Sequence, residues 1–156
     1  MSYIGNRCAV DQYGCMYVIT HEHSSGHHCG IRKYDDEGNY MGGTSSIRAK
    51  GKTTVVNEIE GIAVDSQGNI FLACVLTGAT TTANRNTGFV MKLDDEFHYV
   101  DRKDVSDYFA TSNIGSLAVD EYGMIYVGGD GRVSGASMAV ILDDELNVYK
   151  DLGTSV

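Results

Sequence analysis

The segment His21–Cys29 is the part of the sequence best suited to metal chemistry, because it holds four of the five histidines of the 156-residue chain. Its first two histidines stand two positions apart, so both rings point to one side of an extended strand. Together with the later histidines, or with the glutamate and cysteine of the segment, they could complete a tetrahedral Zn²⁺ site. The segment lacks the Cys-x-x-Cys or His-Glu-x-x-His spacing of established motifs, so a polar turn that binds metal only adventitiously is the alternative. The candidate ligands are His21, His23, His27 and His28.

Two further polar segments are candidate contact loops for a ligand or a protein partner. The segment Thr77–Gly88 is rich in hydroxyl and amide side chains and carries one cation, so it can hydrogen-bond a sugar or a peptide. The segment Gly128–Gly135 is rich in glycine but lacks the Lys-Ser/Thr of a phosphate-binding loop. Loops of this composition are also found simply solvated. The candidate contact residues are Thr82, Asn84, Arg85, Asn86, Asp130 and Arg132.

The remaining composition excludes several classes of function. No Gly-x-Ser-x-Gly elbow and no pairing of a nucleophile with a base is present, so we expect neither an enzyme nor a required cofactor. The net charge of −9 argues against a nucleic-acid partner, since affinity for phosphate backbones comes from clustered Lys and Arg. No apolar run approaches the roughly 18 residues of a membrane span, and no secretion signal is apparent, which predicts a soluble chain in the cytoplasm.

Two sequence motifs recur three times in the same order, and they must position these candidate residues. The first motif has Ala-Val-Asp, two variable residues, Gly and an apolar run; its copies begin at Cys8, Ile62 and Leu117, with offsets of 54 and 55 residues. The second motif ends in Asp-Asp-Glu, and its copies begin at Ile31, Val90 and Ala139. Asp at the first turn position can accept hydrogen bonds from its own backbone two residues on, while Gly tolerates positive φ. Each motif therefore predicts two strands joined by a tight turn.

Each repeat is thus a four-stranded antiparallel meander, and stacked sheets of this kind with repeats of about 40–55 residues are typical of propeller blades. The predicted fold is all-β, with three blades that form half of a six-bladed β-propeller. The blades occupy about 1–50, 51–105 and 106–156 within a single domain. Strand order places the short turns on one rim and the variable candidate loops on the other.

The segment Gly61–Ala73 resembles the NHL repeat and the related gluconolactonase-like repeat, and residues 35–40 resemble the second half of these repeats. The resemblance implies the propeller fold. It does not select a function, because such propellers include binding modules, lyases and lactone hydrolases. Gluconolactonase-like enzymes hold a divalent metal in the central channel with Glu, Asn and Asp side chains, and no such ligand can be carried over to a position of this sequence.

Closed propellers have 4–8 blades, so three blades leave two apolar faces open. We expect two copies to join head to tail into a six-bladed ring as a homodimer. The function this predicts is a non-enzymatic binding or assembly module that oligomerises through its end blades and contacts a partner through the rim loops. The alternatives are a structural component of a virion or another large protein assembly, and a metal-dependent gluconolactonase-like hydrolase or lyase.

Overall fold

The computed structural model describes residues 7–22, 28–48, 56, 58–76, 87–109, 114–129 and 137–153. They form three four-stranded antiparallel sheets, and within these ranges no helix occurs. We call the sheets blade 1, blade 2 and blade 3. Blade 1 contains β1 (Cys8–Val10), β2 (Met16–Glu22), β3 (His28–Tyr34) and β4 (Tyr40–Thr44). Blade 2 contains β5 (Glu58–Val64), β6 (Ile70–Leu76), β7 (Thr87–Leu93) and β8 (Tyr99–Asp104). Blade 3 contains β9 (Ile114–Val119), β10 (Ile125–Gly129), β11 (Ser137–Leu142) and β12 (Val148–Gly153).

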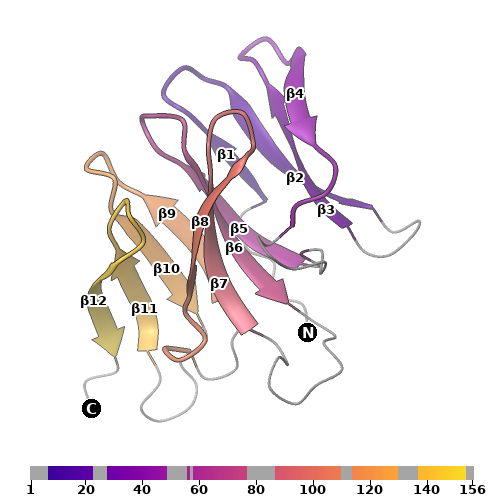
Figure 1. Cartoon of the computed structure of the whole chain (residues 1–156). Coiled ribbons are helices and arrows are strands. Elements are labelled where there is room, and N and C mark those ends of the chain that lie inside the picture. Colours follow the sequence, from indigo (N-terminus) through magenta and orange to yellow (C-terminus); the bar gives the residue numbers. More distant parts are fainter. Residues whose placement is uncertain are drawn as a thin grey trace.

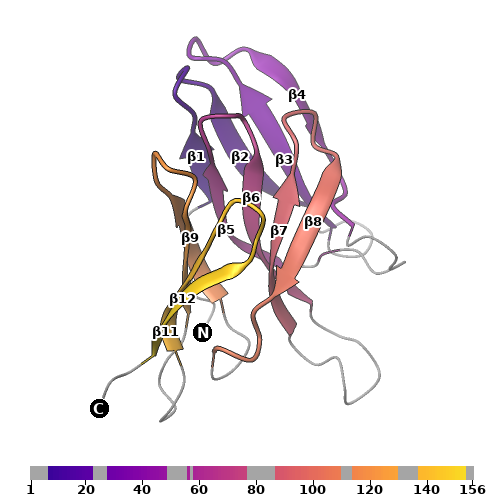
Figure 2. The same cartoon turned by 60° about the vertical axis from the view of Figure 1, so that its left-hand side comes forward.

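The blades stack face to face in chain order, with blade 2 between the other two (Figure 1). The first strand of each blade lies next to the first strand of its neighbour, so β1, β5 and β9 run along one side of the stack. The outer strands β4 and β8 lie on the opposite side (Figure 2). The predicted all-β architecture of three four-stranded antiparallel blades is confirmed, and the exact blade boundaries stay a prediction.

Six tight turns of one design close the hairpins at the same end of the stack (Figure 1). In each turn the leading Asp accepts backbone N–H bonds from the residues two and four positions later; Asp65 Oδ1, for example, lies 2.9 Å from Gln67 N and 2.8 Å from Asn69 N. In the turns between the first and second strands, the Gly three positions after this Asp has positive φ, as at Gly68 with φ 87°. The predicted turn chemistry therefore forms these hairpins. The leading residues are Asp11, Asp35, Asp65, Asp94, Asp120 and Asp143.

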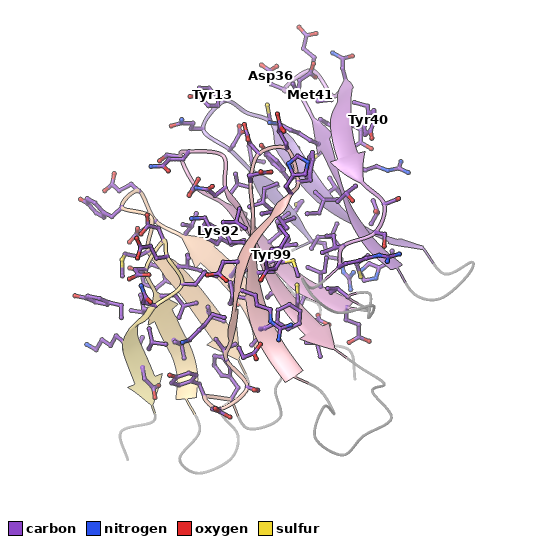
Figure 3. All side chains as sticks on the ribbon, in the orientation of Figure 1. Tyr13, Asp36, Tyr40, Met41, Lys92 and Tyr99 are labelled. Atoms are coloured by element: carbon purple, nitrogen blue, oxygen red, sulfur yellow. The ribbon has the colours of Figure 1, made fainter. Side chains whose placement is uncertain are left out.

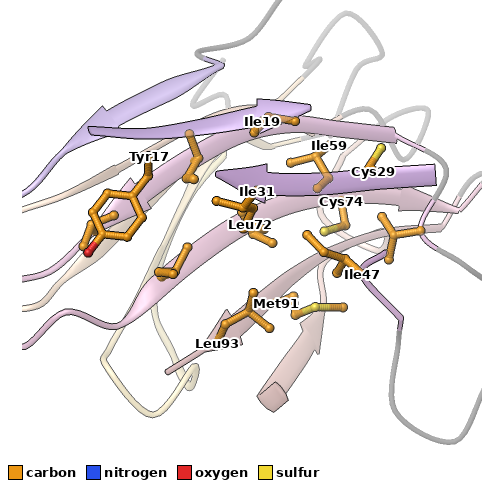
Figure 4. Close-up of a cluster of buried hydrophobic side chains, with 14 of the residues drawn as sticks. Tyr17, Ile19, Cys29, Ile31, Ile47, Ile59, Leu72, Cys74, Met91 and Leu93 are labelled. Carbon is orange, nitrogen blue, oxygen red and sulfur yellow. The ribbon is translucent and has the colours of Figure 1, made fainter. Parts of the chain in front are cut away.

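Two hydrophobic cores hold the blades together. The first lies between blades 1 and 2, with Tyr17 and Ile31 of blade 1 in one cluster with Leu72 and Leu93 of blade 2 (Figure 4). The second lies between blades 2 and 3 and contains Phe71 of blade 2. Alternation along each strand gives blade 2 two apolar faces, because successive side chains point to opposite sides of a sheet.

The described ranges hold no helix with both the length and the apolar character needed to cross a membrane.

Candidate assembly interface

Most of the candidate site residues lie outside the part of the chain that the structure describes. This applies to His23 and His27 and to all six candidate contact residues, Thr82, Asn84, Arg85, Asn86, Asp130 and Arg132. His28 begins β3, where its backbone pairs with that of Glu22 in β2. Metal binding by the histidines and partner binding by the rim loops therefore remain predictions.

His21 is the candidate ligand whose surroundings the structure defines. It sits opposite Cys29 in the β2–β3 ladder, and its Nδ1 lies 3.5 Å from Cys29 Sγ. Its Nε2 contacts the Arg7 guanidinium. Burial raises the pKa of the Cys29 thiol to about 11, so the free thiol is neutral at neutral pH. The described residues contain no group of three His, Cys, Asp or Glu side chains placed to hold a metal ion.

The packing between blades follows one repeated pattern of cross-strand rows. We call the side of a blade that points toward the next blade in sequence its forward face, and the opposite side its rear face. The forward face carries an alanine and an aromatic ring as a cross-strand pair, and the rear face carries a row of apolar side chains over all four strands. The forward pairs are Ala9–Tyr17 in blade 1 and Ala63–Phe71 in blade 2. The rear rows are Val64–Ile70–Leu93–Tyr99 in blade 2 and Val119–Ile125–Leu142–Val148 in blade 3.

Both existing interfaces bury these groups deeply. Tyr17 and Phe71, the two forward rings, are each 0% exposed. Ile70 and Ile125, in the facing rear rows, are also 0% exposed. One row of rear side chains therefore receives one forward ring at each junction, which is the unit that holds neighbouring blades together.

The rear face of blade 1 repeats the buried row but has no described neighbour. Its row is Val10–Met16–Tyr34–Tyr40, equivalent by repeat position to Val64–Ile70–Leu93–Tyr99. Val10 is 61% exposed and Met16 is 38% exposed. The Tyr34 and Tyr40 rings contact each other edge to face, with centroids 5.9 Å apart. Tyr40 projects from the end of the molecule, while its equivalent Tyr99 lies within the stack (Figure 3).

The forward face of blade 3 repeats the forward pair and also has no described neighbour. Its row is Ala118–Tyr126–Ile141–Lys150, and Tyr126 is 40% exposed. The Tyr126 hydroxyl donates to Asp120 Oδ2 at 3.0 Å, and this hydrogen bond raises the pKa of the phenol. Tyr17 makes the equivalent bond to Asp11 Oδ2 at 3.2 Å, so both rings are held in the same orientation.

Polar contacts at the turn end accompany the apolar rows. Gln12 Nε2 of blade 1 donates to the backbone oxygen of Ser66 in blade 2 at 2.9 Å. Lys92 Nζ of blade 2 donates to the backbone oxygen of Asp144 in blade 3 at 2.8 Å and lies over the Phe71 ring. These bonds join neighbouring blades at the turn end, and Lys92 also covers the edge of the core with its ammonium group.

Sequence reasoning located the open ends but did not identify the side chains on them. The exposed side chains that continue the buried rows, such as Met16 and Tyr126, are apolar or aromatic, and these types raise no signal in a search for chemically reactive residues. The available signal was the repeat itself, because aligning the three copies places Met16 with Ile70 and Tyr126 with Phe71.

Comparison with known proteins supports the fold. No known protein family and no curated protein matches the chain. Among solved structures, the chain is similar to a gluconolactonase from Xanthomonas campestris, with a TM-score of 0.52 and 10% sequence identity. The match covers 95% of this chain and 46% of that protein, so the chain spans about half of its length. A protein of unknown function from Bacteroides caccae matches with a TM-score of 0.35 and 14% identity, over 96% of this chain and 66% of that one.

The gluconolactonase-like part of the expected resemblance is thus supported at the level of the fold, and the NHL part remains a prediction. At 10% identity the likeness brings no activity and no site residue to this chain.

Proposed function

We propose that this chain is a non-enzymatic assembly module of the β-propeller class, which oligomerises through the open faces of blades 1 and 3. One observation carries the proposal: both end faces repeat the rows that are buried between blades, yet Val10, Met16 and Tyr126 are exposed. Contiguous exposed apolar side chains of this kind mark interaction surfaces in soluble proteins. The rim loops that contain Arg85 and Arg132 are proposed to contact the ligand or partner.

Two further roles rest on the same architecture. A structural component of a virion or another large assembly would use the same open faces on a different neighbour. A metal-dependent hydrolase or lyase would need a ligand set in the channel, and the gluconolactonase likeness supplies only the fold. We prefer the assembly module because it rests on exposed side chains of the end faces, which the structure describes.

The test compares the purified chain with a double variant, Met16→Glu plus Tyr126→Glu, that places a charge on each open face. We measure the particle mass by light scattering and the binding of an apolar fluorescent dye. If the faces are assembly surfaces covered by other copies of the chain, the double variant lowers the particle mass. If they bind a different partner that is absent from the sample, the double variant lowers the dye signal. If neither quantity changes, the end faces are not interaction surfaces and the proposal is wrong.

A further inference from the structure

We infer that a second copy of this chain covers both open faces, with blade 3 of each copy packed head to tail on blade 1 of the other, so that two copies close one six-bladed ring. This inference rests on the proposed assembly function and names the partner. It treats the two open faces as the two halves of one interface rather than as two separate surfaces.

The two open faces are complementary. Each existing junction joins an Ala–aromatic pair on a forward face to a four-strand apolar row on a rear face. The forward face of blade 3 offers the pair Ala118–Tyr126, and the rear face of blade 1 offers a row built around Met16. A junction between them would repeat the contacts that the chain already makes twice, with Tyr126 in the place of Tyr17 and Phe71.

The side chains of the forward row differ between blade 3 and the other two blades. Lys33 and Lys92 follow the aromatic ring in blades 1 and 2, and Ile141 stands at this position in blade 3. The cationic residue of this row in blade 3 is Lys150, which lies one strand further out and pairs with Ile141 across β11 and β12. Lys92 reaches the β11–β12 turn of the next blade at Asp144. The equivalent turn of blade 1 carries Asp35, Asp36 and Glu37, so the cation of Lys150 would meet an acidic turn of the second copy.

The head-to-tail geometry also accounts for closure. A head-to-tail contact closes a ring when the rotation it imposes returns to the starting copy, and two copies give a two-fold ring with two identical junctions. Packing the same face of two copies together would instead set Tyr126 against Tyr126, a contact without precedent in either existing core.

The experiment uses two variants that each spoil one face, Met16→Glu on blade 1 and Tyr126→Lys on blade 3. The wild-type chain is expected to reach a plateau at twice the 16.9 kDa of one copy in analytical ultracentrifugation. Each variant alone carries its charge in both junctions of the ring. We therefore expect the Kd of its dimer to rise by about 100-fold or more, because a lone charge must be desolvated against an apolar face.

Mixing the two variants provides the decisive measurement. In a head-to-tail ring, one junction of the mixed dimer is entirely wild type, and the other pairs the carboxylate of Met16→Glu with the ammonium group of Tyr126→Lys. An equimolar mixture is therefore expected to regain a 1:1 dimer at concentrations where each variant alone is a monomer. Dimers formed by either variant alone would show that identical faces pair, and would overturn the inference.

Two readings of the wild-type chain would also overturn it. A single species of 16.9 kDa at all concentrations excludes a second copy. A mass that keeps growing with concentration indicates an open filament instead of a closed ring. If the monomer binds the apolar dye and the double variant does not, the assembly function stands with a foreign partner and only the second copy is excluded.

Matched controls separate the interface from general effects of charge. Val100 is an exposed apolar residue of β8 in the middle blade, away from both open faces, so Val100→Glu and Val100→Lys should leave the dimer intact. Circular dichroism and urea unfolding verify that the variants are folded.

The exposed thiol of Cys8 lies on the rear face of blade 1, opposite Val18. Alkylation of this thiol should therefore be several-fold slower in the wild-type dimer than in the Met16→Glu monomer.

Discussion

Leu146 and Phe97 hold a left-handed backbone conformation that a β-carbon disfavours, with φ of 64° and 68°. Both occupy the turn position at which blade 1 has Gly38. Leu146 is buried in the core between blades 2 and 3, and Phe97 packs against the core between blades 1 and 2. The apolar burial of each side chain offsets the backbone strain at its position, which is why these turns keep a large residue where glycine is the easier choice.

We expect Leu146→Gly to be less destabilising than Leu146→Ala, by about 1 kcal/mol, because both lose the same packing and only Gly relieves the strain. Leu142 provides the control, since it is equally buried in β11 but is not among the positive-φ residues. There the order should reverse, with Gly worse than Ala by about 0.5–1 kcal/mol. Urea unfolding measures both pairs, and the same order at the two positions would contradict this account.

At the scale of the hairpin, each turn depends on one carboxylate that gathers the backbone N–H groups of its own loop. Asp94 Oδ1 accepts from Glu96 N at 3.0 Å and from His98 N at 2.8 Å. The hydrogen bond from the His98 backbone is the main cause that lowers the pKa of Asp94. In Asp35, the side-chain bond from Asn39 is the main cause that lowers the pKa. The ionised form is therefore the one that fits the turn.

Acid should weaken the hairpins through these carboxylates. Because the folded pKa of Asp94 is lowered, its contribution to stability is present above the unfolded value of about 3.9 and is lost as pH falls through the folded pKa. We expect Asp94→Asn to lose less free energy of unfolding than the wild type between pH 6 and pH 3, at one fixed protein concentration. Asp95→Asn removes the same charge from the same turn and should behave like the wild type. An unchanged acid response of Asp94→Asn would refute the link.

The strands and turns were predictable from the sequence because both are local. The apolar run of β6 and the Asp65-to-Gly68 spacing before it identify a hairpin without knowledge of the rest of the chain. The positive φ of Leu146 was not predictable, since it depends on a core formed with another blade. Nor does periodicity show which face of a strand points forward, because both faces of blade 2 are apolar. The predicted loops fall outside the described residues, so the candidate interface is identified by exposed side chains whose equivalents are buried between blades.

At the scale of the whole molecule, the two ends differ in how closely they match the buried junctions. On the rear face of blade 1, Arg32 stands where blade 2 has Met91 and blade 3 has Val140. Met91 and Val140 are both fully buried, whereas Arg32 is exposed. The aliphatic part of an arginine can cover apolar surface, but burial of its guanidinium carries a desolvation cost. In the proposed dimer, this face would therefore pack less tightly than the junctions inside the chain.

Replacing Arg32 with the residue of blade 2 should strengthen the contact between copies. We expect Arg32→Met to lower the dimer Kd by about tenfold, because the desolvation cost disappears and the apolar row widens. Dilution series in the ultracentrifuge measure the change. Lys103→Met is the control, since it removes one positive charge from β8 in the middle blade and should leave the Kd unchanged. A weaker dimer in Arg32→Met would mean that the guanidinium is bound by an anionic group of the second copy, and that the junction is held by charge as well as by apolar packing.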